Sequence, residues 1–263
     1  MKLRTTLVVL LSVLALVAAA CGGSESGISD TSAAEVGEES VPEAESEAQA
    51  GEEDDAPSEA ASDFPVTIES DGGIWTLESA PERIVSLSPT ATEILFAIGA
   101  GDQVVAVDSF SYFPDEAPVT DLSGFDPNVE AVIAFDPDFV VLSNDANDLI
   151  ASLTELGIPV LVSPAPSDIE GGYVTMTDLG VATGRVDETA AVIAVMRDEI
   201  AAAYAVAPET SIRVYHELGD SLYSASSFGF VGSVYAKMGA ANIADEADAD
   251  KSGFPQLTEE YII

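Results

Sequence analysis

The feature that most limits the possible folds is a repeated alternation between short apolar runs and helical patterns. Four runs of three or four mostly apolar residues lie between positions 84 and 162: Ile84–Leu87, Val104–Val107, Phe139–Leu142 and Val160–Val162. Runs that are apolar on both faces are typical of strands in a parallel sheet with helices on both sides. The sequence therefore predicts an α/β fold.

Helical segments are predicted between and after these runs. Their positions follow from apolar spacing and end signals and are 91–98, 126–134, 148–156 and 167–184. Thr90 with Glu93, and Ser167 with Glu170, have the spacing of capping boxes. Before the first run, residues 66–68 and 74–77 alternate around Ser70-Asp71-Gly72-Gly73, which predicts a β-hairpin.

The loops after the apolar runs are the expected ligand site. In open parallel sheets, ligands bind beyond the carboxyl ends of the strands. Here those loops carry hydroxyl, amide and aromatic side chains, at residues 88–90, 108–113, 143–147 and 163–165. No glycine-rich phosphate-binding motif follows the first run, which argues against a nucleotide-binding domain.

Polar and aromatic residues of these loops, and of the segment beyond residue 212, are candidate ligand contacts. The polar candidates are Ser88 with Pro89 beside it, Asn144, Ser163 and Ser226. The alternative for each serine and for the asparagine is a capping or turn-forming role, and Ser88 can serve both. Tyr112 and Phe228 are candidates for contact with a large, flat ligand, with core packing as the alternative.

His216 is the only histidine, and it follows a predicted strand at residues 212–215. It is a candidate ligand contact, but a hydrogen-bonded histidine at a strand end is the favoured interpretation. A transition-metal site would need several histidine, thiolate or carboxylate ligands, so no metal site is expected. No triad context surrounds this histidine, so no catalytic residues are expected and the chain is not predicted to be an enzyme.

The chain divides into five predicted parts. Residues 64–184 form an N-terminal α/β lobe, and residues 185–206 form one long helix of about 30 Å that connects it onward. Residues 207–263 begin a second α/β lobe that is shorter than the first, so we expect a truncated lobe. The remaining two parts precede residue 64.

The N-terminal 63 residues predict export and tethering. A basic start, an apolar run and three alanines precede Cys21, the only cysteine, which is the layout of an export signal over residues 1–21. The alternative, a short transmembrane anchor, needs about 20 apolar residues, more than this run provides. Residues 22–63 contain no basic or aromatic residue and predict a disordered acidic tether.

The charge of the chain excludes one class of partner. Its formal net charge is −39, from 47 acidic and 8 basic residues. Such a chain repels phosphate backbones, so a nucleic-acid partner is not expected. It also repels anionic lipid headgroups, so contact with a membrane is expected through a lipid and not through a basic patch.

Five motifs stand out from residue 83 onward: "RIVSLSPTATEILFAIGAGDQVVAVD", "DPNVEAVIAFDPDFVVLS", "LTELGIPVLVS", "SLYSASSFGFVGSVYAKMGAANIAD" and "GFPQLTEEYI". Their order and spacing resemble the substrate-binding proteins of ABC importers for cobalamin and ferric siderophores, the class III periplasmic binding proteins. Together the motifs cover almost everything from residue 81 onward. The cysteine after small residues likewise resembles the lipobox of bacterial lipoproteins, which implies acylation at Cys21.

The resemblance implies two three-layer α/β/α lobes joined by one long helix, with a ligand in the cleft between them. It implies a membrane-anchored extracytoplasmic lipoprotein, expected as a monomer without a cofactor of its own. This protein would capture a metal chelate (a corrinoid such as cobalamin, a ferric siderophore or haem) and deliver it to an ABC permease with its ATPase. Only Arg213 lies near a candidate site, which favours a neutral or cationic ligand such as a corrinoid. The alternatives are a ligand-sensing lipoprotein and an enzyme on the same scaffold.

The resemblance also implies docking residues. The family uses one acidic residue at the tip of each lobe to pair with permease arginines. Glu260 matches the second of these. The first falls at or beside Asn147, which departs from the pattern and leaves Asp148 as the candidate.

Overall fold

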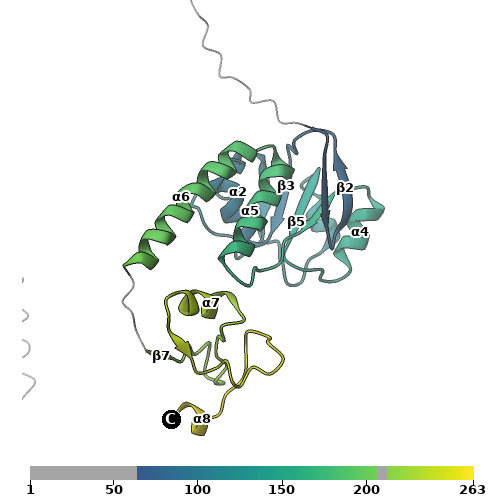
Figure 1. Ribbon diagram of the computed structural model, residues 1–263. Helices are drawn as coiled ribbons and strands as arrows, with labels where there is room; N and C mark the ends of the chain where they lie inside the picture. The colour runs from purple at the N-terminus through teal and green to yellow at the C-terminus, as the bar shows by residue number, and fades with distance from the viewer. Residues whose placement is uncertain (1–63, 207–211) are drawn as a thin grey trace, which may run out of the picture. The chain divides into compact units, whose positions relative to one another are not determined.

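The computed structural model describes residues 64–206 and 212–263 (Figure 1). The predicted export signal with Cys21 (residues 1–21), the predicted tether (22–63) and the start of the predicted second lobe (207–211) lie outside these residues. None of the described helices combines the length and the apolar character that crossing a membrane requires.

Residues 64–206 are built around a four-stranded parallel sheet. Its strands occur in the order β4-β3-β5-β6, and every neighbouring pair is parallel. The bounds match the four predicted apolar runs: β3 is Ile84–Leu87, β4 is Val104–Val107, β5 is Phe139–Leu142 and β6 is Val160–Val162. The predicted parallel sheet is therefore confirmed.

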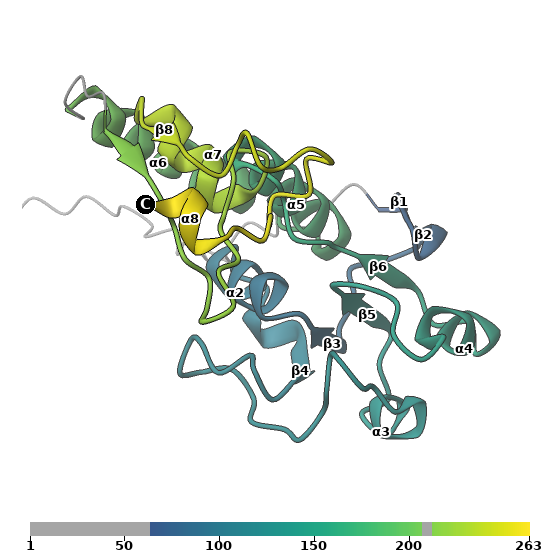
Figure 2. The ribbon, with the colours of Figure 1, turned by 90° about the horizontal axis from the view of Figure 1, so that it is seen from below.

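Helices cover both faces of this sheet, as Figure 2 shows. Helices α2 (Pro89–Ala97) and α5 (Ile169–Thr183) pack on one face, and α3 (Val129–Ile133) and α4 (Leu149–Glu155) pack on the other. The side chains of strand β5 point to both faces. Phe139 and Val141 belong to one buried cluster, and Val140 and Leu142 belong to the other. A strand buried on both faces places alternate side chains in two cores.

A β-hairpin protects one edge of the sheet. Strands β1 (Val66–Ser70) and β2 (Gly73–Leu77) pair in antiparallel fashion, as predicted. The Ser70 hydroxyl accepts a hydrogen bond of 3.1 Å from the backbone N–H of Val162 in β6. Because an open edge strand can pair with another chain, this contact removes one exposed donor from the edge.

The helices begin at slightly different residues from those predicted. The cap of α2 is Ser88, which confirms the capping role considered for it, and not Thr90; its hydroxyl accepts from the Ala91 N–H at 3.3 Å. The cap of α5 is Asp168, not Ser167. Helix α3 begins at Val129 after its cap Asn128, so Asp126-Pro127 lies before the helix and not in its first turn. Each cap is the polar residue with extended backbone directly before the first turn, which the spacing rule alone did not identify.

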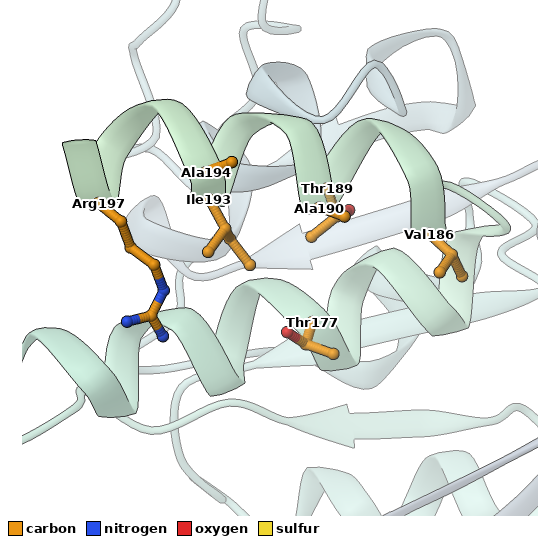
Figure 3. A pocket seen from close by; sticks show the side chains of 7 residues that line it. All are labelled: Thr177, Val186, Thr189, Ala190, Ile193, Ala194 and Arg197. Carbon is orange, nitrogen blue, oxygen red and sulfur yellow. The ribbon is translucent and has the colours of Figure 1, made fainter. Parts of the chain in front are cut away.

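Helix α6 (Val186–Ala205) is the predicted long helix, and it packs along α5. Val192, Ile193 and Ile200 are partly buried against the same core cluster as α5. A groove with a volume of about 380 Å³ follows the seam between the two helices, with Arg197 reaching from α6 toward α5 (Figure 3). Arg197 holds Glu170 through two hydrogen bonds of 2.7 and 3.0 Å and lies 4.1 Å from the centre of the Tyr173 ring.

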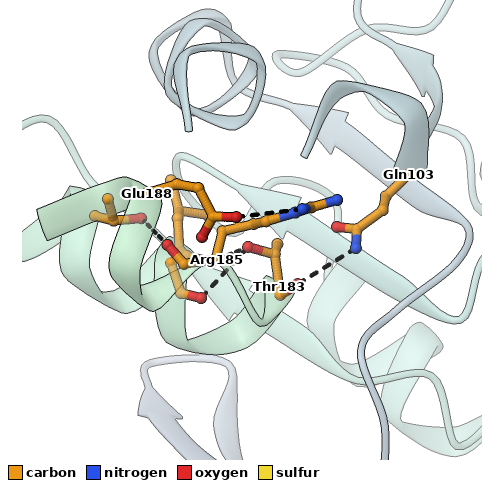
Figure 4. Close-up of polar contacts among 7 residues, drawn as sticks. Gln103, Thr183, Arg185 and Glu188 are labelled. Carbon is orange, nitrogen blue, oxygen red and sulfur yellow. Dashed lines mark hydrogen bonds and ion pairs between the residues drawn. The ribbon is translucent and has the colours of Figure 1, made fainter. Parts of the chain in front are cut away.

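Polar contacts secure the corner between α5 and α6 (Figure 4). Gln103, at the end of the short 3-10 helix η1 (Gly101–Gln103), donates from its amide to the carbonyl of Thr183 at 3.3 Å. Arg185 contacts Glu188 at 3.5 Å, and the Thr189 hydroxyl donates to the Arg185 carbonyl at 2.6 Å. These bonds hold the first turn of α6 close to the end of α5.

Residues 212–263 contain fewer and shorter helices and strands than residues 64–206. Strands β7 (Arg213–Val214) and β8 (Ala241–Asn242) pair in parallel, and helices α7 (Phe230–Lys237) and α8 (Glu259–Ile262) accompany them. The predicted strand at 212–215 is thus only two residues long. This part has a two-stranded sheet, so residues 212–263 hold less sheet than residues 64–206, and the prediction of an incomplete second lobe stays a prediction.

Gly180 is required where α6 approaches α5. A Cβ atom added at Gly180 would lie 2.3 Å from the Thr189 hydroxyl oxygen, and Thr189 is buried. We expect Gly180→Ala to lower the free energy of unfolding by about 1–3 kcal/mol, because overpacking forces backbone shifts. Urea unfolding followed by circular dichroism measures this change. Gly172→Ala in the same helix is the matched control: its Cβ would meet only Pro166 at 3.9 Å, so it should stabilise by ~0.5–1 kcal/mol. Equal changes in the free energy of unfolding for the two variants would contradict a close contact between Gly180 and Thr189.

Candidate ligand-binding site

The predicted site loops meet at one edge of the sheet. Strands β3, β4, β5 and β6 end at Leu87, Val107, Leu142 and Val162, and the register pairs Leu87 with Leu142 and Leu142 with Val162. The residues that follow the strands are Ser88, Asp108, Ser143 and Ser163. Because all four strands are parallel, their carboxyl ends and these loops share one edge, called here the carboxyl edge.

Most polar candidates at the carboxyl edge make hydrogen bonds within the protein. Ser88 is buried and caps α2, while Pro89 is exposed in the first turn of that helix. The backbone N–H of the half-buried Ser163 donates to the Leu142 carbonyl at 2.7 Å. Asn144 is exposed, and its amide donates to the Ser143 hydroxyl at 3.2 Å. Asn144 and Pro89 are therefore more accessible to a ligand than Ser88.

Aromatic side chains form an exposed patch at the carboxyl edge. Four rings in the loops between β4 and α3 are more than half exposed: Phe110 (55%), Tyr112 (80%), Phe113 (59%) and Phe125 (75%). Phe110 and Phe125 make an edge-to-face pair with ring centres 5.5 Å apart and planes at 87°. Exposed apolar surface where such rings gather in neighbouring loops marks sites of ligand or partner contact. These four residues are called the aromatic patch below.

Sequence reasoning selected Tyr112 in this patch and missed Phe110 and Phe125. The sequence did indicate that both rings could be exposed. They lie in a segment without helical or strand periodicity, so no core position is predicted for them. Their pairing could not be predicted, since they are 15 positions apart in two different loops.

Asp108 lies buried beneath the aromatic patch, with an exposed fraction of 3%. Its Oδ1 accepts a hydrogen bond of 2.7 Å from the Phe110 N–H, whereas its Oδ2 has no hydrogen-bond partner. Burial raises the pKa of Asp108 above its ordinary value, and hydrogen bonds from Phe110 and Ser111 counter that rise only in part. A buried carboxyl group at the carboxyl edge was not among the predicted site residues.

His216 makes local hydrogen bonds. Its Nδ1 lies 3.0 Å from the Tyr235 hydroxyl, and its carbonyl accepts from the Ala225 N–H at 3.1 Å. This geometry agrees with the favoured interpretation of a hydrogen-bonded histidine at a strand end. No group of three or more histidine, cysteine or acidic side chains suited to a metal ion occurs in residues 64–206 and 212–263.

Ser226 belongs to a buried hydrogen-bond network. Its hydroxyl donates to Asp248, which also accepts from the backbone N–H groups of Ser252 and Gly253, each at 2.9 Å. Burial alone would raise the pKa of Asp248, but hydrogen bonds from Ser226, Gly253 and Ser252 outweigh it and lower the pKa to about 2. Ser226 has no exposed surface, so its place here is structural.

The remaining candidates are accessible. Phe228 is partly exposed, with the Lys251 ammonium 5.1 Å from its ring centre. Asp148 and Glu260 are both exposed, at the starts of α4 and α8. The neighbouring Asn147 amide is occupied, because it donates to Asp126 at 2.8 Å and to the Pro127 carbonyl at 3.2 Å.

The groove along α5 and α6 is separate from the predicted site. Its lining residues are Thr177, Val186, Thr189, Ala190, Ile193, Ala194 and Arg197. None of these follows a strand of the sheet, and none is a predicted ligand contact. The chemistry at the carboxyl edge, and not the helix seam, is therefore the basis of the candidate site.

Comparison with known proteins gives the chain a family. A family model described as periplasmic binding protein matches residues 84–263. A cobalamin-binding protein of Halobacterium salinarum is 37% identical over 217 residues, which are 79% of this chain and 58% of that protein. The uncharacterized ABC transporter substrate-binding lipoprotein YvrC of Bacillus subtilis is 28% identical over 76% of this chain and 66% of its own length. The chain thus spans less than two thirds of either relative.

Solved structures support the fold. The periplasmic vitamin B12 binding protein of Vibrio cholerae superposes with a TM-score of 0.58 at 23% identity, covering 69% of this chain and 72% of that one. At this identity the likeness concerns the fold alone. It agrees with the parallel sheet and its covering helices described above.

The Asp248 network makes stability depend on pH in the acidic range. The folded-state pKa of about 2 lies below the ordinary value of 3.8, so the carboxylate stabilises the fold above pH 4 and loses this contribution as the pH falls toward 2. We expect Asp248→Asn to lower the free energy of unfolding at pH 7 by on the order of 2 kcal/mol. The difference from the wild type should shrink between pH 4 and pH 2, as measured by chemical unfolding. Asp220→Asn, at an exposed position of the same part of the chain, should change little; a constant Asp248→Asn deficit at all pH values would refute the assignment.

Proposed function

Because the chain belongs to the periplasmic binding protein family, we propose that it is an extracytoplasmic substrate-binding protein that captures a metal chelate for an ABC importer. The family consists of binding proteins, and membership confirms the prediction that the chain is not an enzyme. The ligand class, the membrane anchor and the permease partner are parts of the proposal.

The aromatic patch at the carboxyl edge is the observation that carries this proposal. Four rings that could be buried in a core are instead exposed, in loops that follow a strand of the parallel sheet, and two of them, Phe110 and Phe125, pack against each other. A flat conjugated macrocycle, such as a corrin or a porphyrin, offers apolar area that such rings can cover. The residue types thus favour binding through shape and apolar contact over binding through charge.

The positions of the arginines favour a corrinoid over an anionic chelate. Residues 64–206 contain three arginines, and each is engaged away from the carboxyl edge. Arg83 donates to the carbonyls of Phe135 and Asp136, Arg185 contacts Glu188, and Arg197 holds Glu170. An anionic siderophore or a haem propionate would call for a free arginine near the ligand. The name of the Halobacterium salinarum relative points the same way.

The remaining parts of the proposal concern delivery. Acylation at Cys21 would anchor the protein, and the acidic segment 22–63 would tether it within reach of a permease, which raises the effective concentration. Asp148 and Glu260 would each meet a permease arginine, which is supported by their exposure. Residues 212–263, with Phe228 exposed, would contribute to a second wall of the ligand cleft.

Removal of a patch ring should weaken binding of a corrinoid. We expect Phe110→Ala and Tyr112→Ala each to raise the Kd for cyanocobalamin by about tenfold, because aromatic side chains are frequent among the contacts whose truncation is costly, and about 1.4 kcal/mol is tenfold in Kd. Isothermal titration calorimetry with the full chain measures this change, with haemin and a ferric siderophore as alternative ligands. Ile74→Ala, at a 70%-exposed position on the hairpin, is the matched control and should leave the Kd unchanged. Failure of all three ligands to bind the wild-type protein would reject the ligand class.

Charge reversal at Glu260 should separate docking from capture. We expect Glu260→Lys to lower uptake by about tenfold or more in cells that depend on this importer, because it places like charges opposite each other. Calorimetry should show an unchanged Kd for the ligand. Glu199→Lys, on the exposed side of α6, reverses the same charge and should affect neither quantity. A weaker ligand affinity of Glu260→Lys would contradict the docking role.

A further inference from the structure

A cluster of buried polar side chains lies beneath the aromatic patch. Ser86, Thr92, Ser111 and Asp108 are all at most 3% exposed, and they come from β3, α2 and the loop after β4. The Thr92 hydroxyl lies 2.9 Å from the Ser86 hydroxyl and 3.2 Å from the Ser111 hydroxyl. Since a hydroxyl has one proton, Thr92 donates to one of them and accepts from the other. This cluster joins the loop to the sheet and to α2.

Asp108 fixes the tight turn that presents Phe110. Its backbone N–H donates to the Ser86 carbonyl at 3.0 Å, and its carbonyl accepts from the Ser111 N–H at 3.0 Å. Its Oδ1 accepts from the Phe110 N–H at 2.7 Å, which makes an Asx turn inside the backbone turn. The backbone at Phe110 is therefore held by one carboxylate oxygen in addition to the backbone turn.

The same residue contacts the loop that presents Phe125. Asp108 and Leu122 form a parallel bridge, and the Ser109 N–H donates to the Leu122 carbonyl at 2.8 Å. A Cβ atom added at Gly124 would lie 2.7 Å from the Leu87 carbonyl and 3.4 Å from Asp108 Oδ2. The loop around Gly124 thus lies directly against the end of β3 and against the second oxygen of Asp108.

The free oxygen of Asp108 indicates a role beyond packing. A buried carboxylate oxygen without a partner is unfavourable, and an apolar residue of similar size would avoid that cost. What an apolar residue could not provide is the acceptor for the Phe110 N–H. The contacts of Asp108 with both loops therefore explain why a carboxyl group occupies this buried position despite the cost.

We propose that Asp108 is a positioning residue of the ligand site, which holds the two loops so that Phe110 and Phe125 keep their edge-to-face pair ready for a flat ligand. Asp108 itself is too buried to touch the ligand. This inference rests on the proposed function for the consequence on affinity, but the positioning can be tested without any ligand.

The first test uses the wild-type protein alone. Amide hydrogen exchange by NMR should show the Phe110 N–H strongly protected although its side chain is 55% exposed. Cross-peaks between the Phe110 and Phe125 rings should be visible in a sample with labelled phenylalanine. Exchange of the Phe110 amide at the rate of an unstructured peptide would overturn the proposal, whatever any variant does.

The second test compares substitutions at Asp108. We expect Asp108→Ala to abolish protection of the Phe110 amide, to lose the ring cross-peaks and to raise the Kd for cyanocobalamin by about tenfold. Asp108→Asn keeps an oxygen acceptor and should retain protection, cross-peaks and affinity within about twofold. Asp138→Ala is the matched control: that carboxylate accepts from the N–H groups of Glu82 and Arg83 at the opposite edge of the sheet, so its loss should leave the patch unchanged.

The outcomes separate the inference from the proposed function. Unchanged protection, cross-peaks and affinity in Asp108→Ala would overturn the positioning role, and so would equal losses in the Ala and Asn variants. If the wild-type protein binds no cyanocobalamin, the proposed ligand is rejected, while the exchange and cross-peak measurements still decide the positioning role. The positioning role is supported if Asp108→Asn keeps the amide protection and the ring cross-peaks while Asp108→Ala loses both.

Discussion

The burial of four short parallel strands on both faces is the constraint on which the rest of residues 64–206 depends. The four strands are buried almost along their whole length, so nearly all of the side chains that line both cores are apolar, with Ser86 of β3 as a hydrogen-bonded exception. Helices then have to cover both faces, and the hairpin of β1 and β2 covers an edge. Polar and aromatic chemistry is left to the positions where strands end. Parallel pairing collects all of those ends at one edge, which is why a single edge carries the candidate site.

The carboxyl edge contains two kinds of side chain, buried polar groups and exposed aromatic rings. Ser86, Ser88, Thr92 and Asp108 are buried and bonded to backbone or to each other, so they shape the loops. The rings of Phe110, Tyr112 and Phe125 remain exposed and can meet a ligand. Residues 212–263 show the same pattern. Ser226 and Asp248 are buried and hydrogen-bonded to each other, while the residues directly after Ser226, Ser227 and Phe228, are partly exposed. Hydroxyl groups next to a strand end are thus better read as supports than as ligand contacts.

The sequence was sufficient for the elements that depend on local pattern. The bounds of β3, β4, β5 and β6 follow from apolar runs, because a strand buried on both faces tolerates few other residues. The helix caps were misplaced by one or two residues, since capping depends on which backbone is extended and not on spacing alone. The Phe110–Phe125 pair and the burial of Asp108 could not be foreseen, because both depend on two loops that meet only after the sheet forms. The local hydrogen bond of His216 agrees with the interpretation favoured from the sequence, whereas its role as a ligand contact stays a prediction.

If the proposed ligand is a flat chelate, its selection would depend on loop geometry more than on individual contacts. Apolar contact discriminates weakly between macrocycles of similar size, because one methylene more or less changes affinity only modestly. The engaged arginines of residues 64–206 add no ion pair at the edge that could sharpen the choice. What remains is the shape of the surface that the rings present, and that shape is set by the turn at Asp108 and by the close approach of Gly124 to Leu87. Under the proposed function, residues that never touch the ligand would therefore determine which flat molecule the exposed rings can cover.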